Sequence, residues 1–202
     1  MTTTSNLWPR LGRIAALGAM LTLTACSPKP AAAVPQSPFQ LTATIQDIMH
    51  HEVDPSADFL WDAVGTTVTS KGEEHQMPHT DEEWNELRHR AITLVEATNL
   101  LVMEGRKVVA DGKEVEDAHV TGIRNAQEIQ AAINADRATW IGFAQALHGA
   151  GAQALAAIDA RDADKLLHAG EALDAVCEAC HLKYWYPGQV IPPLPDVIPK
   201  TQ

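Results

Sequence analysis

The sequence is poor in the residues that several common kinds of protein need. It has 15 lysines and arginines against 26 aspartates and glutamates, for a formal net charge of −11. This deficit of basic residues argues against binding to nucleic-acid phosphates or to an anionic membrane face. The cysteines are few and odd in number, Cys26, Cys177 and Cys180, which disfavours a small disulfide-stapled fold. The 202 residues suffice for one globular domain with its own core.

Motifs of hydrolytic and nucleotide chemistry are missing as well. The sequence contains no G-x-S-x-G, no H-E-x-x-H and no phosphate-binding loop. Six histidines lack metal-site spacing, and we expect them to be exposed: His75, His79, His89, His119, His148 and His168. We therefore expect that this protein is not an enzyme.

Proline is scarce in the middle of the chain, where only Pro55 and Pro78 lie between residues 39 and 186. The same segment has no run of alternating β-branched residues long enough to indicate a sheet. We therefore expect an all-α domain over residues 40–187. A proline-rich tether, residues 26–39, precedes it, and a proline-rich tail, residues 188–202, follows it.

The N-terminus has the pattern of an export signal. Arg10 and Arg13 precede an apolar run, residues 14–25, that is too short to span a bilayer. The run ends in Leu-Thr-Ala-Cys26, which resembles the lipobox of bacterial lipoproteins. The resemblance implies cleavage of residues 1–25, lipidation of Cys26 and anchoring on the periplasmic side of a membrane, with the outer membrane favoured because serine follows Cys26. The alternative is an ordinary signal peptide that is cut nearby.

Four amphipathic stretches are expected to be helical, because apolar residues recur in them at spacings of three and four. They cover residues 41–68, 80–102, 125–158 and 162–187. Asp54 and Pro55 interrupt the first stretch, with Asp54 expected to cap its second half. Four such helices with three connections predict an antiparallel four-helix bundle.

Helix caps support the starts of the later stretches. Thr80 with Glu83, and Asn125 with Glu128, have the spacing of capping boxes, and Asp162 is a further N-cap. The third helix is expected to run past thirty residues without interruption.

The last stretch carries Cys177-Glu-Ala-Cys180-His181, and C-x-x-C-H is the attachment signature of c-type haem. In that chemistry the two thiols bond covalently to the haem, and the histidine is the proximal iron ligand. On a helix, Cys177, Cys180 and His181 fall within an arc of about 100° on the core-facing side. Attachment outside the cytoplasm agrees with the export signal, which is an independent feature of the chain.

The motif has three other interpretations. A thioredoxin-like pair begins a helix that follows a strand, whereas this motif lies about fifteen residues into a helix. A structural zinc site needs four ligands, and no second Cys/His pair stands at finger spacing. The third is chance occurrence in a helical lipoprotein that carries no haem.

Residues 40–187 resemble the cytochrome c′ type, or class II, c-type cytochromes. The resemblance rests on the C-x-x-C-H motif near the end of the last helix, on the aromatic segment 184–187 and on the first-helix segment 48–56. It implies a four-helix bundle with one haem c, covalently bound between the helices near the C-terminal helix. The resemblance also leaves open whether the protein forms a homodimer, because many relatives pair through their first helices.

Met49 is the candidate for the sixth iron ligand. In the family, this position is either empty or filled by a methionine of the first helix, and Met49 lies on the apolar face of that helix. The alternatives are that Met49 only fills the core, or that His50 or His51 ligates the iron. Methionine ligation predicts a one-electron carrier. An empty site predicts a five-coordinate haem protein that binds nitric oxide or carbon monoxide. In the first case, the acidic surface favours a redox partner with a basic patch.

Overall fold

The structure is a computed structural model that describes residues 39–189. The expected signal peptide, Cys26, almost all of the tether and residues 190–202 of the tail lie outside the described residues, so those predictions are untested. Within residues 39–189, no helix combines the length and apolarity needed to cross a membrane.

The described part of the chain is mostly helical. Its first helical segment consists of α1 (Ile45–Ile48), the π-helical turn η1 (Met49–Val53) and α2 (Asp54–Trp61), which follow one another without a break. The later helices are α3 (Asp81–Leu101), α4 (Ala126–Ala135), α5 (Arg137–Asp159) and α6 (Ala163–Tyr184). Two strands, β1 (Gly65–Thr69) and β2 (Gly72–Gln76), pair antiparallel between α2 and α3.

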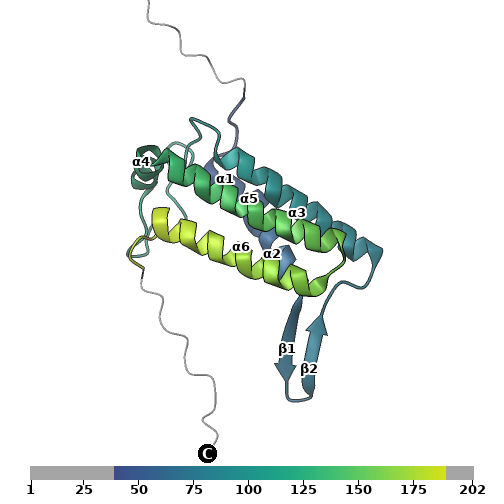
Figure 1. Cartoon of the computed structure of the whole chain (residues 1–202). Coiled ribbons are helices and arrows are strands. Elements are labelled where there is room, and N and C mark those ends of the chain that lie inside the picture. The colour runs from purple at the N-terminus through teal and green to yellow at the C-terminus, as the bar shows by residue number, and fades with distance from the viewer. Residues whose placement is uncertain (1–38, 190–202) are drawn as a thin grey trace, which may run out of the picture. The chain divides into compact units, whose positions relative to one another are not determined.

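The long helices surround a common core. Helix α3 packs against α5, α5 packs against α6, and α2 contacts both α3 and α6, so that contacts run in a closed cycle (Figure 1). Fully buried side chains from each helix meet inside, among them Leu60, Leu94, Ile133, Leu166 and Leu173. The amphipathic faces expected from the sequence are thus buried against one another.

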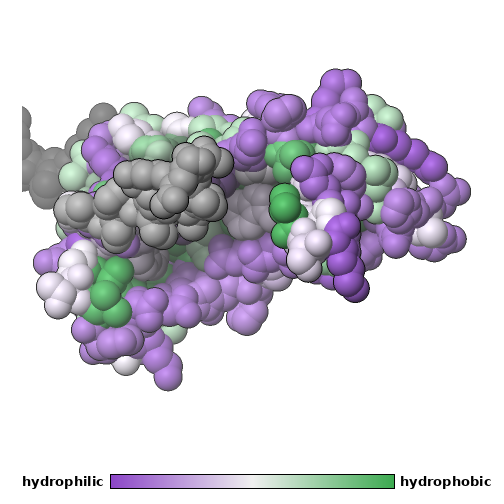
Figure 2. All heavy atoms as spheres, turned by 90° about the horizontal axis from the view of Figure 1, so that it is seen from below, coloured by the Kyte–Doolittle hydropathy of each residue, from purple (hydrophilic) through white to green (hydrophobic). Residues whose placement is uncertain are grey.

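The hairpin corrects the expectation that no sheet forms and that the first helix continues to residue 68. Val68, expected on a helical face, lies in β1 and is 76% exposed. Threonine and valine are β-branched and favour strands, and Gly72 closes the turn with a φ of +129°. The hairpin projects away from the helices (Figure 1), and most of the residues coloured in the view from below are hydrophilic (Figure 2).

The expected cap at Asp54 and the expected single third helix are wrong, and three other capping expectations are confirmed. Asp54 caps nothing, because η1 runs directly into α2. The third helix is interrupted at Asp136, whose side chain accepts a hydrogen bond from the backbone N–H of Thr139 (3.1 Å) and so starts α5 separately from α4. The capping boxes at Thr80 and Asn125 and the N-cap at Asp162 form as predicted.

Gly151 allows the close approach of α5 to α3. A Cβ built at this position would lie 2.7 Å from Leu94 Cδ2 and 3.0 Å from Val95 Cγ2, whereas one built at Gly149 on the same helix would meet nothing within 4 Å.

We expect Gly151→Val to lower the free energy of unfolding by about 1–3 kcal/mol more than Gly149→Val, because only the first overpacks an interface. Urea titrations of both variants measure the difference, and equal losses would contradict this packing.

Candidate functional site

The C-x-x-C-H motif lies in the last two turns of α6. Cys177, Cys180 and His181 are all half-buried, and neither cysteine is in a disulfide. Helix α6 places the three side chains on one side, as the sequence predicts. Towards its start, the same helix touches α2 closely: the Trp61 indole N–H donates to the carbonyl of Gly170 (2.9 Å), and a Cβ on Gly170 would lie 3.0 Å from the indole.

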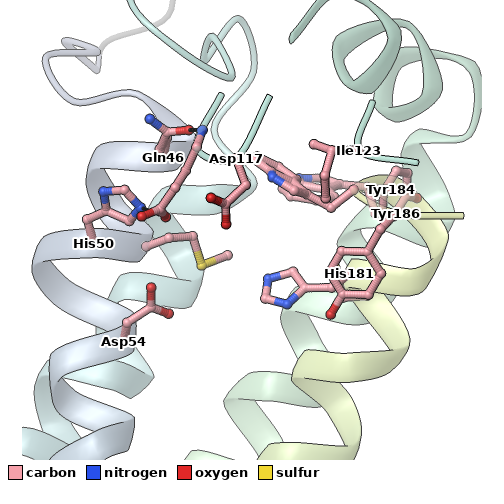
Figure 3. A pocket seen from close by; sticks show the side chains of 13 residues that line it. Gln46, His50, Asp54, Asp117, Ile123, His181, Tyr184 and Tyr186 are labelled. Carbon is pink, nitrogen blue, oxygen red and sulfur yellow. Dashed lines mark hydrogen bonds and ion pairs between the residues drawn. The ribbon is translucent and has the colours of Figure 1, made fainter. Parts of the chain in front are cut away.

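Beyond this contact, two cavities lie between α6, α5 and the first helical segment. The first has a volume of about 190 Å³ and is shown in Figure 3; the second has a volume of about 270 Å³. Five residues line both cavities: Met49, Asp54, Trp140, Cys180 and His181. The cavities therefore adjoin around the motif.

The second cavity is largely apolar. Cys177 lines it together with hydrophobic side chains from five helical elements, η1, α2, α3, α5 and α6: Val53, Ala57, Trp61, Leu101, Phe143, Ala144, Leu147 and Val176. Both thiols thus face a hydrophobic space. A hydrophobic cavity of this kind suits a large apolar group that is bonded covalently to Cys177 and Cys180.

Met49 lies across the cavities from the motif, on η1. The long connection between α3 and α4 anchors this segment, because the backbone N–H groups of Ile45 and Gln46 donate to the carbonyls of Lys107 (2.9 Å) and Val108 (3.0 Å). The expectation that Met49 points inward is confirmed. Single π-helical turns are frequent at functional sites, and here the turn begins at Met49.

The two histidines that follow Met49 are placed differently. His50 lines the first cavity, but its Nε2 lies 2.7 Å from Glu116 Oε2, so its ring is engaged with the long connection. His51 is exposed and lines neither cavity. Of the six scattered histidines, His148 is half-buried, with Nδ1 3.3 Å from the Thr98 hydroxyl, while the other five are exposed as expected.

Aromatic side chains hold the motif end of α6 in place. Tyr184 is buried and packs edge-on against Trp140, with ring centroids 5.2 Å apart. Trp140 donates its indole N–H to the carbonyl of Leu101 (3.0 Å), which fixes this wall of both cavities. The Tyr186 hydroxyl donates to Glu178 Oε2 (2.7 Å), and its ring lies 5.8 Å from that of His181.

The end of α6 is also tied to the loop before α4. The backbone N–H of Arg124 donates to the carbonyl of Trp185 (2.8 Å), and its guanidinium donates to the carbonyl of Lys183 (3.1 Å). These bonds satisfy carbonyls that a helix end leaves without partners. They hold His181 against the first cavity.

Burial shifts the pKa values of the three reactive side chains of the motif. It raises the pKa of the Cys177 thiol to about 11 and that of the Cys180 thiol to about 12. It lowers the pKa of the His181 imidazole, although Asp54 and Glu178 act in the opposite direction. The neutral imidazole, which has the lone pair needed to bind a metal, is therefore favoured.

Asp54 also belongs to this site, although the sequence predicts a helix cap at its position. Its accessible surface lines both cavities, and the surrounding protein desolvates the carboxyl group enough to raise its pKa. An Asp-Pro pair is so typical of a helix start that no sequence signal pointed to a cavity wall.

The donor set fits a covalently bound haem. Within residues 39–189, no group of three or more His, Cys, Asp or Glu side chains is arranged to hold a metal ion. Two free thiols beside an apolar cavity, an uncharged imidazole and a facing thioether are the groups that haem c uses. The residues present therefore fit this cofactor.

Comparisons with known proteins add no family to this description. No family model matches the chain, and neither the curated proteins nor the solved structures that were searched include a match.

The raised thiol pKa values predict slow alkylation in folded protein that lacks haem. A rise in pKa from 9.0 to about 11 lowers the thiolate fraction of Cys177 at pH 8 about 100-fold, and burial also blocks access. We expect iodoacetamide to modify Cys177 and Cys180 far more slowly in native protein than in urea, with the native rate rising towards pH 11. Peptide mass spectrometry measures each site. Equal rates in native and unfolded protein would contradict the buried placement.

Proposed function

We propose that this protein is a monohaem c-type cytochrome of the cytochrome c′ type that carries single electrons. One observation carries the proposal: the C-x-x-C-H side chains of α6 and Met49 of η1, far apart in sequence, line the same adjoining cavities. The closed cycle of contacts among α2, α3, α5 and α6 supports an antiparallel four-helix bundle, with the haem between the helices near the end of α6.

Each residue of the site then has a defined task. Cys177 and Cys180 would hold the haem through thioether bonds, so that an exported protein could not lose it. His181 and Met49 would be the protein ligands of its iron. The haem, when bound, supplies reversible one-electron oxidation and reduction at its iron. The protein itself holds the ligands in place and excludes water with the apolar wall of the second cavity.

The cell location and partner follow from the rest of the chain. The export signal and the lipobox at Cys26 support a lipid anchor on the periplasmic side of a bacterial membrane. The net charge of −11 supports a redox partner with a basic docking patch, attracted over distance by complementary charge.

The absorption spectrum of the purified holoprotein tests the proposed function and the sixth ligand together. We expect a low-spin spectrum with a sulfur-to-iron charge-transfer band, because Met49 occupies the sixth position. Met49→Ala should abolish that band and give a high-spin spectrum.

Met77→Ala is the matched control, since Met77 is 45% exposed and lines neither of the two cavities. It should leave the spectrum unchanged. A high-spin wild-type spectrum that Met49→Ala does not alter would contradict methionine ligation and favour a five-coordinate protein that binds nitric oxide or carbon monoxide.

A further inference from the structure

Asp54 occupies a special position in the site. It is the only acidic residue among the five that line both cavities. Figure 3 shows its carboxylate directed from α2 into the space that His181 enters from α6. A group that filled the cavities would therefore lie against this carboxylate.

The Asp54 carboxylate makes no hydrogen bond or ion pair with another side chain in residues 39–189. The imidazoles of His181 and His50 lower its pKa, but burial outweighs them. Other acids of the walls do have partners: Glu116 pairs with His50, and Glu178 accepts from Tyr186. An acid without a partner inside a site carries a desolvation cost, which is the physical reason its pKa is raised.

Apart from His50 and His181, whose rings are positive only when protonated, the charged residues around the cavities are all acidic. The acidic residues of the two walls are Asp54, Glu116, Asp117, Asp174 and Glu178, and no lysine or arginine lines either cavity. Haem iron carries one more positive charge when oxidised than when reduced. A carboxylate close to it therefore stabilises the oxidised form, and more strongly in a desolvated site than in water.

We propose that Asp54 is a residue that tunes the haem, and that its carboxylate favours oxidised iron and lowers the reduction potential. The effect opposes that of Met49, because a neutral thioether ligand favours reduced iron. The proposal rests on the proposed function and concerns only how this chain sets the potential of its cofactor.

The test is the midpoint potential of the holoprotein, measured by spectroelectrochemistry at pH 7. Asp54→Asn and Asp54→Ala should both shift the potential upwards, and Asp54→Glu should stay nearer to wild type. Asp58→Asn is the matched control, since it removes the same charge one turn further along α2; Asp54 and Asp58 are both exposed, but only Asp54 lines the cavities. Its shift should be much smaller.

The outcomes separate this inference from the proposed function. The inference is overturned if the Asp54→Asn variant binds haem, stays low-spin and has the midpoint potential of wild type. That result leaves the cytochrome assignment intact. A shift of the midpoint potential in Asp58→Asn as large as that in Asp54→Asn also overturns it. The potential would then depend on the net charge of the protein and not on the position of the carboxylate. A shift that appears only with a changed spin state counts against it as well. Absence of covalently bound haem from wild type overturns both proposals.

Discussion

The packing of α6 against the first helical segment is the interaction on which the site depends. At one end the two elements touch closely, where the Trp61 indole bonds to the backbone at Gly170. At the other end they separate around two cavities, and Met49 faces the C-x-x-C-H motif across them. A helix pair that diverges in this way buries its apolar faces yet leaves room for a cofactor. The aromatic contacts of Trp140 and Tyr184 keep the open end from collapsing.

Features governed by local chemistry could be predicted from the sequence. The capping boxes at Thr80 and Asn125 need only residues three apart, and the inward placement of Met49 follows from helical spacing. The hairpin was missed because its strands are short and almost wholly exposed, so no apolar alternation reveals them. Asp136 was missed because a polar residue inside an amphipathic pattern is usually tolerated, whereas here its side chain bonds to the backbone and breaks the helix.

Tertiary structure decided the remaining features of the site. Asp54 is a cavity residue only because η1 joins α1 to α2 without a break, and nothing local in the sequence distinguishes that from a capped restart. The burial that favours a neutral His181 also keeps the two thiols protonated. Folding therefore prepares the imidazole for iron but makes the cysteines poorly reactive. Thioether formation is accordingly expected before the domain closes around the motif.

The mass of the denatured protein tests the central claim most directly. The chain should be purified from bacteria that attach haem to exported proteins, then unfolded and digested. The account predicts that one haem stays on the peptide containing Cys177 and Cys180, and that replacing both cysteines by serine removes it. A wild-type peptide that carries the mass of its amino acids alone, from cells that load another c-type cytochrome, would contradict the account.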